Sequence, residues 1–319
     1  MGGDRAPVEV LHGAVDAVRR GVDIVLVGDE ALVLPFLADA GSDVPVVHSD
    51  EVITMSDDPV ASLRTKRGAS ISVAARLVAS GEADGLVSAG STGAAMAAAT
   101  LLIGRLPQVA RPAIGTFLPT NKLILDTGAN LAARAEHLVQ FAIMGSALAA
   151  SRFHLERPRV GLLNIGEEAT KGRDVEREAY QLLSELADIN FVGNVEGRDL
   201  GTDVVDVFVT DGFTGNVLLK TAEGTSQLVQ GVLSATLSRP ELAEALGVIG
   251  PALVEARTRL DPETEGGAHL LGIAGVVVIA HGSSSRTAIA NAIVMAAEGA
   301  ADRLPAQIEK GLAAVAAGA

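Results

Sequence analysis

The chain alternates between two hydrophobic patterns along most of its length. Short apolar runs rich in Val, Ile and Leu are typical of buried strands, whereas apolar residues at every third or fourth position are typical of helices packed on a core. Strands are predicted within residues 22–30, 44–53, 85–89, 113–119, 123–130, 159–166, 190–197, 204–211 and 275–282. Helices are predicted within residues 8–20, from Pro59 onward, within 71–79, 93–103, 136–150 and 176–186, and after the last strand.

The repeated succession of strand and helix predicts an α/β fold in a single domain of residues 1–319. Connections of this kind place helices on both faces of a mostly parallel sheet. A chain of 319 residues, of which 48% are hydrophobic, can bury the core that such a layered α/β/α domain needs. We therefore expect the sheet to position any functional site.

Residues 225–260 interrupt this succession with two helical patterns. The patterns break at residues 238–240 and weaken at residues 250–251. At helical spacing, one face carries Leu242, Leu246, Ile249 and Leu253. Either the two helices pack against the core, or they form a hairpin that projects from the body and offers Leu and Ile to a membrane surface or a partner.

Small and polar residues follow four of the predicted strands, where the next helix begins. They are Ser88, Gly90, Ser91 and Thr92; then Asn164, Glu168 and Lys171; then Asp211, Thr214, Asn216 and Lys220; and last His281, Gly282, Ser283 and Ser284. Because the carboxyl ends of parallel strands meet at one edge of a sheet, we expect these residues to line one crevice, completed by Asp126 and Asn130. Main-chain N–H groups at helix N-termini attract anions, so the crevice would bind a negatively charged ligand.

Composition and charge exclude several classes of partner and location. With 39 acidic and 25 basic residues the net charge is −14, which opposes sequence-independent binding to nucleic acid. The chain contains no Cys, no Trp and one Tyr, so disulfides, thiolate metal sites and stacking platforms for single strands are not expected. It shows no signal-peptide pattern and no apolar run of the ~20 residues that a membrane span needs, which predicts a cytoplasmic protein.

A set of motifs in one order along the chain points to a known family. The motifs are MGGDRAP, VSAGSTGAAMA, GRLP followed by RPA, LDTGAN, EHLVQFAIMGS, PRVGLLNIGEEATKG, INFVGNVEGRD, VTDGFTGNVLLKTAEG and GGAHLLGIAGVVVIAHGSSS. Together they closely resemble the PlsX-type phosphate acyltransferases of bacterial phospholipid synthesis. No single motif is decisive, but the ordered set is highly specific.

The resemblance implies a fold, a reaction and a set of partners. The fold would be like that of the isocitrate and isopropylmalate dehydrogenases, in a homodimer related to the phosphotransacetylases and without a cofactor. Inorganic phosphate would attack the thioester of a fatty acyl-[acyl carrier protein], giving acyl phosphate and free carrier protein. A membrane-bound glycerol-3-phosphate acyltransferase would then use the acyl phosphate. Family members associate peripherally with the membrane, which favours a projecting hairpin at residues 225–260.

This reaction requires phosphate to lie beside the thioester carbonyl and donors to meet the oxyanion that forms there. The candidates for binding phosphate are Ser88, Gly90, Ser91, Thr92, Gly282, Ser283 and Ser284, although Ser and Thr at these positions also suit helix N-caps. The catalytic candidates are His281, Lys171, Asp211 and Asn216, and the candidates for other substrate contacts are Asp126, Asn130, Asn164, Glu168, Thr214 and Lys220.

Several of these candidates have a competing structural interpretation. His281 would donate a hydrogen bond, act as a general base, or simply bond to its own loop. Lys171 and Lys220 would neutralise phosphate, although Lys220 also suits the surface of a helix. Asp211 would orient the substrate or tie its turn through an Asx-type bond.

The chain departs from the family pattern at a few positions. Ser91 stands where Asn is usual, Ala132 and Ala133 follow LDTGAN where relatives often have Asp and Cys, and Ile279 stands where Lys is frequent. Relatives also carry a short strand with an aspartate just before MGGD, so we expect a first strand to be missing from this sequence. The change at Ser91 alters a donor of the expected phosphate site.

Because acyl carrier proteins are acidic, a chain with net negative charge needs a local basic patch to bind them. The candidates are Arg64, Lys66 and Arg67, or Arg257 and Arg259. Two other functions remain open: a phosphotransacetylase that uses acyl-coenzyme A, and a non-catalytic membrane scaffold for phospholipid synthesis. A nicotinamide dehydrogenase is disfavoured, since no GxGxxG motif follows an early strand.

Overall fold

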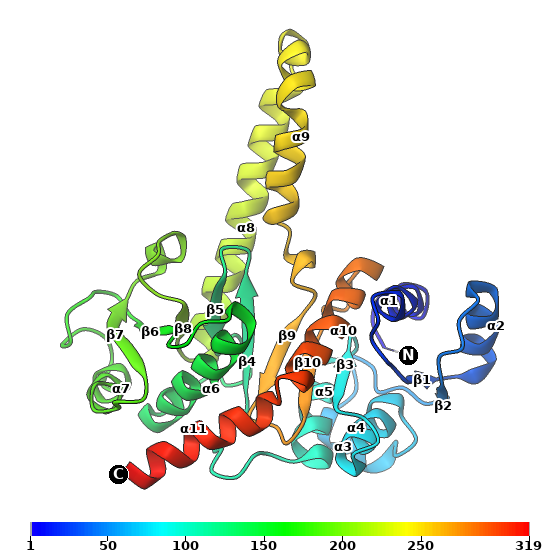
Figure 1. Ribbon diagram of the computed structural model, residues 1–319, viewed down its shortest axis with the longest axis horizontal. Coiled ribbons are helices and arrows are strands. Elements are labelled where there is room, and N and C mark those ends of the chain that lie inside the picture. The colour runs from blue at the N-terminus through cyan, green and yellow to red at the C-terminus, as the bar shows by residue number, and fades with distance from the viewer. Residues whose placement is uncertain (1, 319) are drawn as a thin grey trace.

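The computed structural model describes residues 2–318 (Figure 1). In it the chain alternates between strands and helices, as its hydrophobic pattern predicts. The strands are β1 (Leu26–Gly28), β2 (Val46–His48), β3 (Gly85–Ser88), β4 (Ala113–Leu118), β5 (Lys122–Leu125), β6 (Arg159–Leu163), β7 (Asn190–Val195), β8 (Val207–Val209), β9 (Ala268–Leu271) and β10 (Val276–Ile279). The α-helices are α1 (Val8–Arg19), α2 (Glu30–Ala40), α3 (Pro59–Thr65), α4 (Ser70–Ser80), α5 (Thr92–Ala98), α6 (Ala135–Phe153), α7 (Asp174–Ser184), α8 (Gly212–Leu237), α9 (Ala243–Arg259), α10 (Arg286–Ala301) and α11 (Leu304–Gly318). Short helical turns cover Ala99–Ile103, Gly197–Gly201, Pro240–Leu242 and Pro262–Thr264.

An eight-stranded sheet in the order β3-β10-β9-β4-β5-β8-β6-β7 forms the middle layer. Four of its seven pairings are parallel, so the predicted mostly parallel sheet is confirmed. The other three, β10 with β9, β9 with β4 and β4 with β5, are antiparallel. An odd number of reversals means that β3 and β10 run in the opposite direction to β5, β6 and β8. The strand β9 is absent from the sequence-based expectations.

Helices cover both faces of this sheet because its strands are apolar on both faces. In β10, Val276 and Val278 pack into the cluster that includes Phe141 of α6, whereas Val277 and Ile279 pack into the cluster on the face covered by α4 and α5. Farther along the second face, α8 packs against β5 and β8 through Leu219. Burying each such side chain stabilises the fold by about 1.5–3 kcal/mol.

The first two strands do not join this sheet. They pair with each other in a separate two-stranded parallel sheet. A cavity of about 780 Å³ lies between β1 and β3, and its walls are mainly Val, Ile, Leu, Ala and Gly. The predicted strands at residues 22–30 and 44–53 therefore exist, but they lie across this cavity from the edge of the main sheet.

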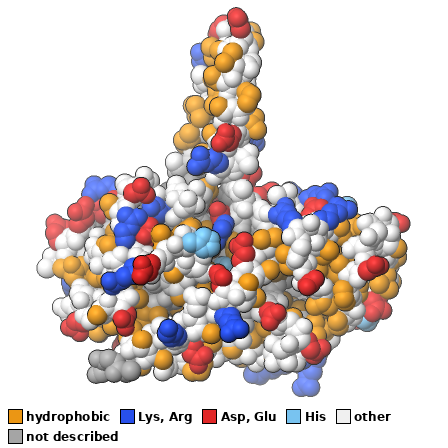
Figure 2. Space-filling view, in the orientation of Figure 1, with side chains coloured by type: hydrophobic (Ala, Val, Ile, Leu, Met, Phe, Trp, Pro, Cys, Tyr) orange, Lys and Arg blue, Asp and Glu red, His pale blue; other side chains and the backbone are white. Residues whose placement is uncertain are grey.

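Helices α8 and α9 form a hairpin that stands out from the body (Figure 1). The buried residues of α8 lie within its first eight residues, at Gly212, Gly215 and Leu219, and α9 has none. The projecting form of the hairpin is therefore confirmed, and the interpretation of two core-packed helices is wrong. Along the hairpin, hydrophobic side chains face solvent (Figure 2). Within the described residues, no helix is both long and apolar enough to cross a membrane.

Candidate functional site

The sheet register separates the predicted site residues into two groups. Followed across β9 and β4, the register places Ile279, the last residue of β10, level with Ile124 of β5. Because the two strands run in opposite directions, the carboxyl end of β10 lies at the same edge of the sheet as the amino end of β5. On standard strand spacings, His281 and Asp126 are about 13 Å apart along the strands and about 14 Å apart across them. The prediction that all four junctions share one edge is therefore wrong. The junctions are separated because an odd number of antiparallel pairings lies between β10 and β5.

The first group, which we call the glycine junction, comprises residues 2–4, 88–92 and 281–284. The Asp4 N–H donates to the Gly282 carbonyl oxygen at 2.7 Å. A Cβ atom on Gly2 would lie 2.8 Å from the Cα atom of Gly90, closer than such atoms approach in proteins. Three segments from distant parts of the sequence therefore cross at a distance that only glycine permits.

The serine side chains of the glycine junction bond to nearby backbone. Ser91 caps α5 by accepting from the Ala94 N–H at 3.3 Å, and Ser88 Oγ accepts from the Gly90 N–H at 3.3 Å. The N–H of the buried Ser284 donates to the carbonyl oxygen of His281 at 3.0 Å. These are the N-capping and turn contacts that compete with a role in binding phosphate.

His281 is exposed, and its own loop sets the orientation of its ring. Nδ1 accepts from the Ser283 N–H at 3.3 Å and lies 2.7 Å from Ser283 Oγ. Because Nδ1 is an acceptor, the neutral ring carries its proton on Nε2. In this form His281 can donate a hydrogen bond to a ligand through Nε2, and its role as a general base stays a prediction.

The second group, which we call the α8 entry site, comprises residues 126–130, 164–173 and 211–216. Its buried foundation is Asp126, which is fully shielded from solvent. Oδ1 accepts from the N–H groups of Ile114, Gly128 and Ala129 at 2.9–3.0 Å, and Oδ2 accepts from the main chain and side chain of Asn130 at 2.7 and 2.9 Å. The structure thus shows internal partners for the Asp126 carboxylate and for the amide nitrogen of Asn130, and the substrate contacts expected of these two residues stay predictions.

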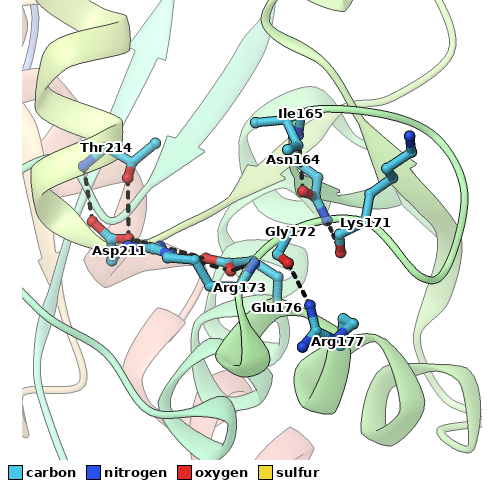
Figure 3. A network of polar contacts seen from close by, with 9 residues as sticks. All are labelled: Asn164, Ile165, Lys171, Gly172, Arg173, Glu176, Arg177, Asp211 and Thr214. Atoms are coloured by element: carbon cyan, nitrogen blue, oxygen red, sulfur yellow. Dashed lines mark hydrogen bonds and ion pairs between the residues drawn. The ribbon is translucent and has the colours of Figure 1, made fainter.

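Asp211 joins two helices at this site (Figure 3). Its Oδ1 caps α8 by accepting from the Thr214 N–H at 2.8 Å, and its Oδ2 accepts from the Thr214 hydroxyl at 3.0 Å. Oδ2 also pairs with the guanidinium of Arg173, which pairs in turn with Glu176 in the first turn of α7. Burial raises the pKa of Asp211, but the Thr214 N–H, the Arg173 guanidinium and the Thr214 hydroxyl outweigh it, so this pKa is lowered overall.

Lys171 lies on the loop that follows β6. The side chain of Asn164 holds this loop by donating to the Lys171 carbonyl oxygen at 3.1 Å (Figure 3). The Lys171 side chain is 47% exposed, and its ammonium group lies 3.9 Å from the Glu168 carboxylate. The Glu168 carbonyl oxygen accepts from the side chain of Asn194 at 2.8 Å. The structure thus presents one weakly paired cation on an anchored loop.

Two further candidates lie along α8. Asn216, in its second turn, is exposed. One turn later, Lys220 pairs with Glu223 at 2.7 Å, and the two side chains are 54% and 27% exposed. Exposed pairs of this kind contribute little to stability, about 0–1 kcal/mol. The surface interpretation of Lys220 is the one that the contacts support.

Sequence reasoning did not identify Arg173. A local signal existed, since Arg173 precedes Glu176 by three residues, a spacing that suits an ion pair at the start of a helix. Its second partner, Asp211, is 38 residues away and becomes visible only when the fold brings β6 beside β8. Within the described residues, no group of three or more His, Cys, Asp and Glu side chains has the arrangement of a metal site.

Comparisons with solved structures show the same fold in enzymes of distant sequence. A phosphotransacetylase from Streptococcus pyogenes is 18% identical, with a TM-score of 0.62, over 93% of this chain and 92% of that one. A branched-chain phosphotransacylase from Enterococcus faecalis is 16% identical, with a TM-score of 0.60, over 94% and 96%. At this identity the likeness establishes the fold.

Comparisons of sequence establish the family. A phosphate acyltransferase of Oceanobacillus iheyensis is 46% identical over 93% of this chain and 90% of its own length, and one of Bacillus subtilis is 42% identical over 97% and 95%. The model of a family described as "Fatty acid synthesis protein" matches residues 1–307. The resemblance drawn from the ordered motifs is confirmed, and this chain belongs to the fatty acid synthesis protein family, whose curated relatives are phosphate acyltransferases.

Proposed function

We propose that the protein transfers a fatty acyl group from an acyl-[acyl carrier protein] to inorganic phosphate, giving the acyl phosphate for bacterial phospholipid synthesis. The family match over residues 1–307 is the observation that carries this proposal. The structurally similar phosphotransacetylases support acyl transfer to phosphate on this fold.

We place the reaction at the α8 entry site because it offers exposed cations, whereas the segments of the glycine junction contain neither Lys nor Arg. The side chains of Lys171 and Arg173 are 47% and 62% exposed there. In the glycine junction, a Cβ atom on Gly282 would lie 3.1 Å from the carboxylate of Asp4. A phosphate anion would be repelled by Asp4 in the glycine junction, whereas Lys171, paired only weakly with Glu168 at 3.9 Å, can still attract it.

The chemistry needs no covalent enzyme intermediate. One oxygen of hydrogen phosphate attacks the thioester carbonyl carbon, the new C–O bond replaces the C–S bond, and the phosphate proton passes to the leaving thiolate. Lys171 would neutralise the phosphate, and the Asn216 amide would donate to the carbonyl oxygen as negative charge develops on it. The products are an acyl phosphate and a free thiol.

Thiol release under matched conditions tests the donor and the site together. Acyl-[acyl carrier protein] and acyl-coenzyme A are each supplied with and without phosphate, to wild type and to Lys171→Met, Asn216→Ala and Ser91→Ala. We expect phosphate-dependent release from the carrier protein, lost in the first two variants and largely kept in the third. Faster release from acyl-coenzyme A would favour a phosphotransacetylase. Wild-type rates in Lys171→Met and Asn216→Ala would remove the α8 entry site from the reaction.

We further propose that the α8–α9 hairpin contacts the membrane peripherally, where a membrane-bound glycerol-3-phosphate acyltransferase takes up the acyl phosphate. Leu228, Val248 and Val254 are 67%, 79% and 66% exposed on the hairpin. Apolar side chains exposed in this way mark membrane or protein contacts. A homodimer that buries the same side chains is the second candidate.

Flotation with phospholipid vesicles separates these two roles. The triple variant Leu228→Ser, Val248→Ser and Val254→Ser should lose vesicle binding while its mass in solution stays that of wild type. Met55 is 61% exposed on the body, so Met55→Ser is the matched control and should bind normally. Unchanged flotation of the triple variant, or a change from dimer to monomer, would assign the hairpin to another contact.

A further inference from the structure

Arg173 connects the two segments that carry Lys171 and Asn216. It directly precedes α7, and its guanidinium bonds to Glu176 at 2.9 and 3.1 Å through Nε, and to both Glu176 and Asp211 through Nη2 (Figure 3). Glu176 belongs to the first turn of α7, and Asp211 is the N-cap of α8. One side chain thus joins the starts of two helices.

We propose that Arg173 is a positioning residue that holds the Lys171 loop against the first turns of α8, and so sets the distance between Lys171 and Asn216. The inference rests on the proposed function, because it assumes that these two side chains act on the same substrate. It assigns Arg173 no contact with the reacting atoms.

The burial of its partners shows why the link depends on a cation. The side chains of Glu176 and Asp211 are 9% and 4% exposed, whereas that of Arg173 is 62% exposed. Two carboxylates buried side by side repel each other and lose hydration, and a guanidinium between them offsets both costs. Its planar set of donors can bond two carboxylates at once, which a lysine ammonium on a flexible stem does less precisely.

The segment that carries Lys171 and leads into Arg173 is closely packed and has little freedom to move independently. Gly172, which separates Lys171 from Arg173, has φ +88°, and a Cβ atom on it would lie 2.6 Å from the side-chain oxygen of Asn164. The Lys171 carbonyl oxygen is held by Asn164 on one side. Arg173 provides the anchor on the other side, toward α8.

The chain offers a matched control for this arrangement. Arg159 and Asp206 form a similar pair, with Nη2 to Oδ1 at 2.7 Å and Nε to Oδ2 at 3.0 Å. The pair lies at the amino ends of β6 and β8, the same strands whose carboxyl ends carry the α8 entry site. Removing Arg159 therefore also unpairs a largely buried aspartate, but at the other end of the strands.

The test compares KM for phosphate, which does not depend on the fraction of the sample that is folded. Arg173→Gln should raise this KM about tenfold or more and lower kcat, since a displacement of about 1 Å at a reacting centre can cost on the order of a hundredfold. Arg173→Lys should fall between Arg173→Gln and wild type. Arg159→Gln should lower the thermal midpoint but leave KM for phosphate within about twofold of wild type.

A wild-type KM for phosphate in Arg173→Gln, or in Arg173→Lys if the first variant does not fold, would overturn the inference. Lys171→Met and Asn216→Ala assayed in parallel distinguish a failure of this inference from a failure of the proposed function. If they lose activity while Arg173→Gln keeps its KM, only the role of Arg173 fails. If they keep wild-type activity, the proposed site itself fails.

Discussion

Single residues show how the α8 entry site is built. The carboxylate of Asp126 accepts hydrogen bonds from four residues, and that of Asp211 caps α8 and pairs with Arg173. Carboxylates whose oxygens already accept several hydrogen bonds have little capacity left for a substrate. We therefore expect structural roles for both, although each follows a strand where a catalytic group would be sought.

Removal of the Asp126 carboxylate should affect stability first. Asp126→Ala leaves buried N–H groups without acceptors, each costing about 1–3 kcal/mol, so we expect a loss of about 3 kcal/mol or more in urea unfolding. Asp58→Ala removes the exposed N-cap of α3 and should cost only about 1 kcal/mol. Unchanged unfolding of Asp126→Ala together with lost activity would instead assign Asp126 to the substrate.

His269 should make the fold sensitive to acid. Burial and the nearby positive charge of Arg152 lower its pKa from 6.5 to about 4. As the pH falls through this window, the unfolded state gains a proton that the folded state does not, so stability should fall by roughly 1.4 kcal/mol per pH unit. Burial raises the pKa of Glu265, which gives an opposite trend. The difference between wild type and His269→Leu, measured by urea unfolding at pH 4.5 and 6.5, isolates the histidine; equal pH dependence would contradict this.

At the scale of elements, α8 contains glycines in two different environments. A Cβ atom on Gly215 would overlap the carbonyl oxygen of Asp126, whereas nothing lies within 4 Å of one on Gly224. The close approach at Gly215 is what seats the first turns of α8 on the loop after β5. The exposed Gly224 makes no such close contact.

Alanine should therefore have opposite effects at these two positions. We expect Gly215→Ala to destabilise the fold by about 1–3 kcal/mol or more through overpacking. Gly224→Ala should stabilise it by up to about 1 kcal/mol, because alanine favours a helix. Thermal unfolding of the two variants checks the claim, and a loss of stability in Gly224→Ala would show that the hairpin packs against something else.

The sequence predicted the positions of the strands better than their directions in the sheet. Each of the nine expected runs overlaps a strand, but the four residues of β9 lie between glycines at 267 and 272 and were too short to identify. Parallel and antiparallel strands buried on both faces have the same apolar pattern, so nothing in it revealed the reversal between β10 and β5. That reversal is why the expected single crevice became two groups.

Local contacts of the site were predictable and distant ones were not. The Asx-type cap of Asp211 on Thr214 follows from a spacing of three residues, and the structure contains it. The pairing of Arg173 with Asp211 depends on the register of β6 and β8, which sequence spacing does not encode. Ion pairs formed across a fold are visible only once the strand order is known.

For the whole molecule, net charge limits how an acidic partner can dock. With a net charge of −14, an acidic carrier protein must find a local basic patch. Of the two candidate patches, the one at α3 uses Lys66 internally, in bonds to Asp57 at 2.8 Å and to the Val52 carbonyl oxygen at 3.1 Å. The exposed Arg257 and Arg259 near the base of the hairpin are therefore favoured.

Charge reversal at the favoured patch should weaken docking of the acyl carrier protein and leave phosphate binding unchanged. Arg257→Glu with Arg259→Glu should raise KM for the acyl carrier protein severalfold and make it less sensitive to salt, because attraction between the surfaces is screened over about 10 Å at 0.1 M ionic strength. KM for phosphate should not change. The same reversal at Arg64 and Arg67 is the comparison, and a larger effect there would move the docking site to α3.

The most direct test of the central claim is the transfer of labelled orthophosphate into product by the purified protein. With palmitoyl-[acyl carrier protein] as donor, we expect one labelled acyl phosphate for each thiol released, and none from Lys171→Met. Thiol release that continues at the same rate without phosphate, or that leaves no label in the acyl product, would contradict phosphate acyl transfer by this protein.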